Sequence, residues 1–255
     1  MNPATSPSHD GPRWRAYLAG EPGELEGWER CFQRGPLRIE REGQSFVLRS
    51  DTFQATDDAR AVRDKAEEAL LLMKGIAAGT SLADWEPPRL RGVAFRDHEG
   101  KLHHYMFAEG IHLRLRAGIP RLEVSGPNGP VDPSPTKWER RASAAARDAH
   151  LAEAMRLFAH DQSWVTLCKV IELAEHFAPR GHLDKWVSKA QRDRITGSAQ
   201  LPATAGRDSR HAVRPHGPPR NSIPLEAAQI LITQLLDGWA ELVWEPSEAS
   251  TRRDS

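Results

Sequence analysis

The chain has 255 residues, of which 39% are hydrophobic and 27% are charged, and its formal net charge is +0. This length allows one large or two modest domains, and the composition is ordinary for a soluble globular protein. Because the charge is balanced, no global field draws the whole molecule to nucleic acid or anionic lipid. Any such attraction has to come from a local patch.

The first fifteen residues are rich in Pro, Ser and Gly, and residues 1–15 are predicted to be disordered. Neither they nor any later segment resembles a signal peptide or a membrane span, so a cytoplasmic protein without a membrane partner is expected. The two cysteines, Cys31 and Cys168, fall in different predicted halves. Neither a disulfide framework nor a structural zinc site is therefore expected, and no cofactor is predicted.

A β-hairpin is predicted over residues 37–49, where apolar and polar side chains alternate around a turn at Glu42-Gly43. Pairing Arg41 with Gln44 would place four apolar side chains on one face, namely Leu37, Ile39, Phe46 and Leu48. This apolar face of the hairpin has to be buried against another part of the chain. The helical pattern of residues 56–74 supplies this cover, and Gly75 is predicted to end this helix.

A second set of strands is predicted at about 90–96, 101–107 and 111–116, with a further candidate at 121–125. Pairing Phe107 with Ile111 puts His104 and His112 on an outward face, with Arg114 opposite His104. A metal site tolerates a facing arginine poorly, so no metal is predicted here. The face is interpreted as a solvated, mildly basic surface, with a polar binding surface as the alternative.

The Pro- and Gly-rich residues 126–135 are the predicted linker between an α+β domain, 16–125, and an α-helical domain, 136–245. Helices are predicted from a capping box at Thr136 to near His160, over 164–177, over 182–195, and from Ser222 to Pro246. The tail, 246–255, is predicted to be disordered. The predicted fold class is therefore α+β, with an N-terminal antiparallel sheet and one covering helix, followed by an all-α C-terminal helical domain.

The most distinctive segment is the basic, proline-broken stretch from Arg192 to Arg220, with six Arg and two His against Asp193 and Asp208. Its core is a predicted long loop, 197–221, which is longer than most loops inside compact domains. Arginine offers a planar fork of donors that suits phosphate oxygens, and histidine titrates near neutral pH. The candidate binding residues are Arg207, Arg210, Arg214 and Arg220. A solvated or structural role for them remains the alternative.

Within this loop, Arg210-His211-Ala212-Val213-Arg214-Pro215-His216 precedes an apolar helical pattern. The spacing of Arg210 and His216 resembles the motif of HEPN-like α-helical domains, and the resemblance covers residues 136–245. It implies metal-independent RNA cleavage by paired subunits, with Arg210, His216 and His211 as the catalytic candidates. Pro215, with the prolines that follow at 218 and 219, departs from the family pattern because it forbids a continuous helix under the motif.

Glycine-rich phosphate loops, GxSxG elbows, HExxH helices and CxxC pairs do not occur in the sequence. The leading expectation is a soluble, bacterial-type, non-catalytic binding protein that contacts a macromolecular partner through the basic loop 192–220. The alternatives are a HEPN-like ribonuclease or defence effector, and a non-specific nucleic-acid binder. The partner and the oligomeric state are not determined by the sequence.

Overall fold

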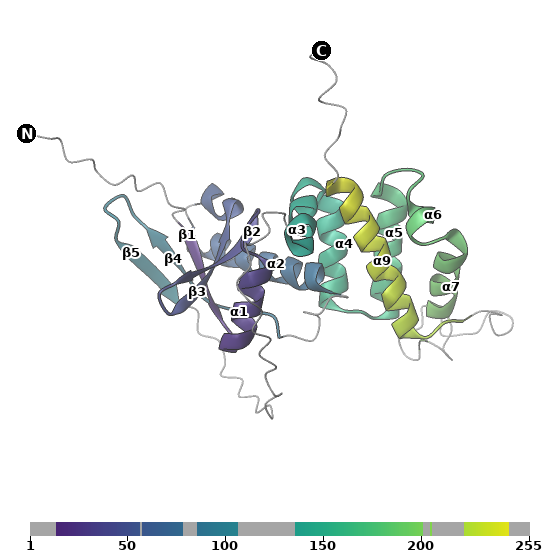
Figure 1. The fold of residues 1–255 in the computed structure, drawn as a ribbon, viewed down its shortest axis with the longest axis horizontal. Coiled ribbons are helices and arrows are strands. Elements are labelled where there is room, and N and C mark those ends of the chain that lie inside the picture. Colours follow the sequence, from purple (N-terminus) through teal and green to yellow (C-terminus); the bar gives the residue numbers. More distant parts are fainter. Residues whose placement is uncertain are drawn as a thin grey trace, which may run out of the picture.

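The computed structural model describes residues 14–56, 58–78, 86–106, 136–200, 205 and 222–244. It has an antiparallel sheet at the N-terminal end followed by helices, which confirms the α+β class (Figure 1). The sheet order is β2-β3-β1-β4-β5. The strands are β1 (Trp14–Ala19), β2 (Leu37–Glu42), β3 (Ser45–Ser50), β4 (Arg89–Arg96) and β5 (Leu102–Met106). None of the described helices is long and apolar enough to cross a membrane.

The central strand, β1, was not predicted, and it begins two residues inside the N-terminal segment 1–15. It pairs with β3 on one side and β4 on the other. Trp14, Ala16 and Leu18 point into the hydrophobic core, and Trp14 Nε1 donates to the Thr56 carbonyl at 2.8 Å. A strand with a neighbour on each side is held chiefly by non-local pairing, which a six-residue pattern reveals poorly.

The predicted hairpin is present as β2 and β3, with Arg41 opposite Phe46 and Ile39 opposite Leu48. The predicted pairing of Arg41 with Gln44 is wrong by two residues because the turn is at Gly43-Gln44, where Gly43 has a φ of 60°. Side chains alternate with a period of two, so a shift of two residues keeps the same face inward. All four predicted apolar side chains are accordingly buried in the core.

Helix α2 (Ala59–Ala77) provides the predicted cover, preceded by a short 3-10 helix, η1 (Asp51–Ala55), and by α1 (Pro22–Cys31), neither of which was predicted. Asp58 caps α2 by accepting hydrogen bonds from the backbone N–H groups of residues 60 and 61. α1 adds Leu25 and Trp28 to the same core. The covered face of the sheet is thus packed on two helices.

The described part of the C-terminal half is helical, and it is broken into more helices than the sequence predicts. The predicted helix from 136 to 160 is broken at Asp148, whose extended backbone starts a new helix by capping residues 150 and 151. The predicted helix 182–195 is likewise split before Ser188, which forms a capping box. The helices are α3 (Lys137–Arg147), α4 (Ala149–His160), α5 (Trp164–Phe177), α6 (Leu183–Trp186), α7 (Lys189–Ala199) and α9 (Leu225–Trp244).

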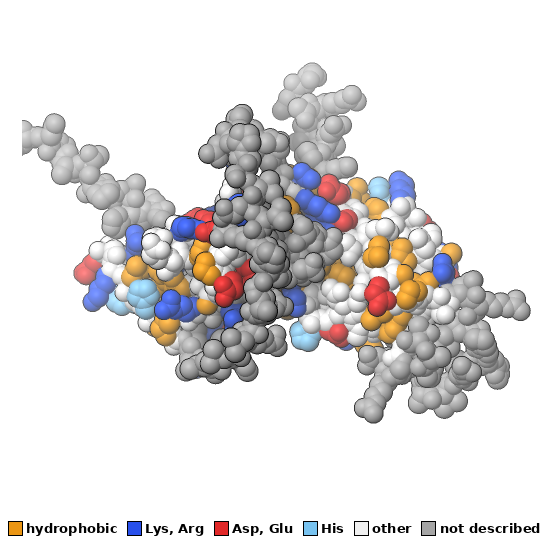
Figure 2. Space-filling model, turned by 60° about the horizontal axis from the view of Figure 1, so that its bottom comes forward, with side chains coloured by type: hydrophobic (Ala, Val, Ile, Leu, Met, Phe, Trp, Pro, Cys, Tyr) orange, Lys and Arg blue, Asp and Glu red, His pale blue; other side chains and the backbone are white. Residues whose placement is uncertain are grey.

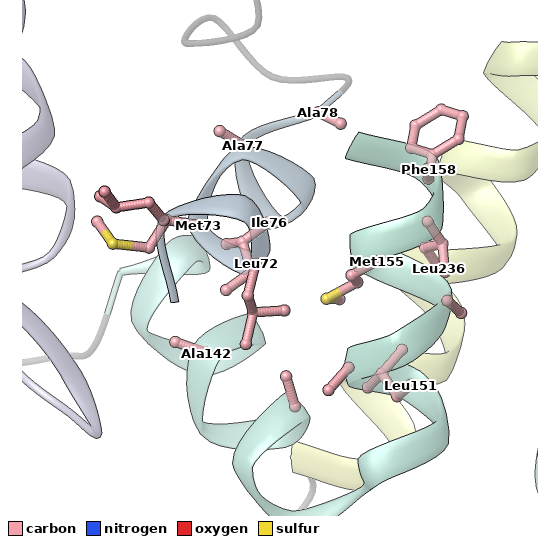
Figure 3. Packing of buried hydrophobic residues seen from close by; sticks show 14 of the residues in the cluster. Leu72, Met73, Ile76, Ala77, Ala78, Ala142, Leu151, Met155, Phe158 and Leu236 are labelled. Atoms are coloured by element: carbon pink, nitrogen blue, oxygen red, sulfur yellow. The ribbon is translucent and has the colours of Figure 1, made fainter. Parts of the chain in front are cut away.

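The two halves meet where α2 crosses α4 (Figure 3). Gly75 does not end α2 as predicted, because the helix continues to Ala77. A Cβ at Gly75 would overlap the backbone carbonyl of Met155, so only glycine allows the two helix backbones to approach this closely. Leu72 and Ile76 flank this point and face Met155. Buried residues of both halves form one hydrophobic cluster.

Arg141 of α3 stabilises the same junction through hydrogen bonds and an ion pair. Its side chain is 3% exposed. One Nη donates to the carbonyls of Ile76 and Ala78 at the end of α2, and the other forms an ion pair with Asp237 of α9. Lys137 Nζ reaches the other carboxylate oxygen of Asp237 at 3.1 Å. The last carbonyls of α2 are therefore satisfied by a cation from the helical half.

Candidate functional site

The basic segment predicted from the sequence falls largely outside the residues that the structure describes. This applies to all six candidate site residues, Arg207, Arg210, His211, Arg214, His216 and Arg220. The predicted hairpin partner of β5, residues 111–116 with His112 and Arg114, also lies outside them. The structure does describe both flanks of the basic segment and five strands of the sheet.

Arg192, the first residue of the basic segment, has a structural role. It is 7% exposed. Its Nε donates to Glu175 of α5 at 3.0 Å, and its Nη1 donates to Asp184 of α6 at 2.8 Å and to the Val187 carbonyl. One guanidinium thus joins α5, α6 and α7, and a buried arginine held this way is not free to bind a ligand.

The two flanks of the basic segment meet at a buried hydrogen bond. Ser198, on the last turn of α7, has no exposed surface, and its Oγ accepts from the backbone N–H of Ile223 at 3.0 Å. Ile223 lies just before α9. Ala205, within the segment, is 9% exposed and belongs to the hydrophobic cluster. The end of α7 and the residues just before α9 therefore meet at one point of the helical half (Figure 1).

The second candidate region is the outer face of the sheet, opposite α1 and α2. The register places Arg38, Arg49, Arg15, Ala94 and His104 in one row across all five strands. Contacts confirm this assignment, since Arg15 and Arg49 both reach Glu42, and the rings of Tyr17 and His104 lie 5.5 Å apart. The outer face therefore carries a row with three arginines and a histidine that composition alone does not reveal.

Carboxylates neutralise this row only at its β2 end. Glu42 receives Arg15 Nη1 at 2.8 Å and also pairs with Arg49, whose Nε donates to Glu40 at 3.0 Å. Arg38 pairs with Glu40 at 3.1 Å. Within the described residues, β1, β4 and β5 place no carboxylate on this face. Among the described residues, the positive charge is thus balanced at the β2 edge and unbalanced towards β5.

Arg96 is the clearest sign of that imbalance. Its side chain makes no hydrogen bond or ion pair within the structure as described, and its buried Nε lacks a partner. The nearest acid in sequence, Asp97, is engaged on the opposite side of the hairpin, where it binds His103 and the backbone N–H groups of residues 99 and 101. The hydrogen bond from His103 is the main reason that the pKa of Asp97 lies below its usual value.

Other reactive groups give weaker candidates. Burial raises the pKa of the Cys31 thiol to about 11, so this cysteine is a poor nucleophile near neutral pH. In the described portion of the chain, His, Cys, Asp and Glu side chains form no group of three that could hold a metal ion. Neither Cys31, which is half-buried, nor Cys168, which is buried, forms a disulfide.

The arginines of the outer face were missed by sequence reasoning because the central strand was missed. Without β1 there is no row, and Arg15 is assigned to the N-terminal segment. A signal was present: in Trp14-Arg15-Ala16-Tyr17-Leu18, apolar residues recur at every second position. The prediction that His104 lies on an outward face of β5 is confirmed by its exposure and by its contact with Tyr17.

Comparison with known proteins adds no assignment: no family model matches this chain, and neither does any curated protein or solved structure.

Proposed function

We propose that the protein is a non-catalytic binding protein that contacts an anionic macromolecular partner through the basic segment 192–220. The observation that carries this proposal is the buried hydrogen bond between Ser198 and Ile223. It fixes the two flanks of the segment to one point of a packed helical core. A partner that engages the residues between them need not disturb α7 or α9, which is how loops on rigid scaffolds commonly carry binding.

The composition of the segment supports an anionic partner. Arg207, Arg210, Arg214 and Arg220 accompany a single acid, Asp208, between the two flanks. Guanidinium groups bind phosphate oxygens through two parallel hydrogen bonds, so a nucleic-acid backbone is the partner that this chemistry fits. The segment has no Phe, Tyr or Trp side chain, the residues on which a single strand usually stacks its bases. A duplex is therefore a better probe than a single strand.

The test is binding of the intact protein to a fluorescent DNA duplex at two salt concentrations. Four phosphate contacts predict that affinity falls by roughly 100-fold between 50 and 200 mM salt. Replacing Arg207, Arg210, Arg214 and Arg220 by Ser should abolish binding at the lower concentration. Fluorescence anisotropy reports both effects. No binding of the wild type at low salt would contradict the proposal.

A matched control separates a site from general charge. Arg60, Arg89, Arg91 and Arg180 are exposed arginines elsewhere on the surface, and replacing all four by Ser changes the net charge by the same amount. Binding should change less than about threefold in this control, because long-range attraction between exposed charges is screened by salt. An equal loss in both variants would show non-specific attraction rather than a binding segment.

A second candidate function, a HEPN-like ribonuclease, is favoured by one observation. The long apolar helix α9 directly follows the segment and packs against α3, α4 and α5 in a helical bundle, which is the setting that the resemblance implies for Arg210 and His216. Induced expression should then slow growth and degrade RNA, and Arg210→Ala or His216→Ala should restore both. Growth and RNA that are the same with wild type and Arg210→Ala would rule this candidate out.

A further inference from the structure

On the outer face of the sheet, β4 has small, buried residues at Gly92 and Ala94. Gly92 and Ala94 pair with Tyr17 and Arg15 of β1 on one side. On the other side, Ala94 pairs with His104 of β5. Arg96 lies two residues further along β4 and is a diagonal neighbour of Arg15, about 7–8 Å away between Cα atoms. Two arginines and a histidine therefore surround an alanine.

The two arginines have donors without acceptors among the described residues. Arg96 has no hydrogen bond or ion pair with any described residue, and the buried Nε of Arg15 is also without a partner. An unpartnered Nε alone would mean little, because Arg141 has one as well. The difference is that the other nitrogens of Arg141 bind three oxygens, whereas those of Arg96 bind none. Arg96 is thus a cation that has no counter-ion among the described residues.

The third donor beside the two arginines is the imidazole of His104, and the ring of Tyr17 contacts it. Tyr17 contacts the ring of His104 at 5.5 Å between centroids, so the imidazole is supported on one side while its residue stays exposed. Positively charged and histidine side chains lie close together at the sheet end of the surface in Figure 2. An imidazole can donate from either ring nitrogen, depending on its tautomer and charge. The site therefore offers two guanidinium groups and one imidazole.

We propose that Arg15, Arg96 and His104 form a binding site for a phosphate group on the outer face of the sheet. The nearest carboxylates, Glu40 and Glu42, are already occupied by Arg15, Arg38 and Arg49. A phosphate carries up to two negative charges and several acceptor oxygens. It could accept from Arg96, which has no acceptor among the described residues, and from the unpartnered Nε of Arg15, whose Nη1 is paired with Glu42. The site is separate from the basic segment and does not depend on the function proposed for it.

The experiment is isothermal titration of the full-length protein with inorganic phosphate, a nucleoside monophosphate and a short single-stranded oligonucleotide in a chloride buffer. Arg96→Gln should weaken phosphate binding about tenfold or more, because it removes charge-assisted hydrogen bonds. Arg96→Lys keeps the charge but loses the planar fork, so its affinity for phosphate should lie between those of the wild type and Arg96→Gln. Arg96 makes no hydrogen bond or ion pair with a described residue, so both variants should fold, which circular dichroism can verify.

Arg91→Gln is the matched control, since Arg91 is exposed on the same strand, at the irregularity between β1 and β4. Its phosphate affinity should stay within twofold of the wild type. An equal loss in Arg91→Gln, or no loss in Arg96→Gln, would overturn the proposal. Loss of phosphate binding in the variant with Ser at 207, 210, 214 and 220 would also overturn it, because binding would then belong to the basic segment.

The three ligands distinguish the sources of the phosphate. If the oligonucleotide binds more tightly than inorganic phosphate and loses affinity in parallel in Arg96→Gln, the site accepts a nucleic-acid backbone. If only the small ligands bind and Arg96→Gln weakens them, the site accepts a free phosphate or a nucleotide. Either result supports the site, and absence of binding by all three ligands would contradict it.

Discussion

The junction of the two halves and the outer face of the sheet use arginine in opposite ways. At the junction, Arg141 is 3% exposed and its terminal nitrogens bind two carbonyls and a carboxylate. On the outer face, Arg96 is only partly buried and has no acceptor among the described residues. The same side chain thus completes the fold in one region and leaves an unmet hydrogen-bonding capacity in the other.

The difference shows what decides the role of an arginine. A guanidinium that neighbours saturate stabilises structure, since burying a charge is tolerated only when it is paired. A guanidinium without a protein acceptor keeps its donors for water or for a ligand. Sequence composition counts both alike, so the two roles can be separated only through the contacts. The following predictions test that separation.

The largest effect is expected at the junction. Arg141→Met should destabilise the protein by about 3–5 kcal/mol, because it leaves the α2 carbonyls and Asp237 without their cation. Urea denaturation followed by circular dichroism measures the change. A loss below about 1 kcal/mol would mean that Arg141 does not hold the halves together, and the contrast with Arg96 would fail.

Gly75→Ala should destabilise by about 2–3 kcal/mol, because the added methyl group would overlap the Met155 carbonyl and force α2 away from α4. Gly197→Ala is the control in another helix, where a Cβ would meet no atom within 4 Å. That variant should stabilise the protein by about 0.5–1 kcal/mol through helix propensity. The two melting temperatures should move in opposite directions, and a shift of the same sign would refute the close approach.

Ser198→Ala should cost about 1–2 kcal/mol, because it leaves the buried N–H of Ile223 without an acceptor. Thr196→Ala serves as the control on the same helix, since its hydroxyl donates only to carbonyls of its own helix. Its effect should stay within about 0.5 kcal/mol. Equal effects in thermal denaturation would show that the Ser198 hydrogen bond does not fix the flanks of the basic segment.

The smallest change in stability is expected for Arg96→Gln, within about 0.5 kcal/mol of the wild type, because no described contact is lost. Urea denaturation in phosphate-free buffer checks this value. A loss above 1 kcal/mol would show that Arg96 supports the fold. Arg96 would then be a structural arginine like Arg141, and the proposed difference between the two regions would be wrong.

The elements that the sequence predicts well are those set by local pattern. The apolar face of the β2–β3 hairpin is correct despite the wrong register, because both registers share the same alternation. The capping box at Thr136 and Glu139 is present as predicted, with both reciprocal hydrogen bonds. The break at Asp148 had a local signal too, since Asp is a favoured N-cap residue, but the surrounding helical pattern concealed it.

What could not be predicted depends on residues far apart in the chain. Gly75 reads as a helix terminator, and its actual role is set by Met155 in another helix. The sequence places Arg192 in a basic segment, but its guanidinium is ion-paired with Glu175 and Asp184. The row of arginines on the outer face exists only because β1 lies in the middle of the sheet. The six candidate residues of the basic segment remain predictions, since they lie outside the described residues.

The continuity of α2 has a consequence for how the molecule unfolds. The helix packs against β1 and β4 of the sheet and also against α3 and α4. Neither half can lose α2 without exposing apolar surface that it now buries. The two halves should therefore melt in a single cooperative transition, although the described sheet lies in one half and the other is helical where it is described. A protein cleaved within residues 126–135 should likewise stay together as two non-covalently associated pieces.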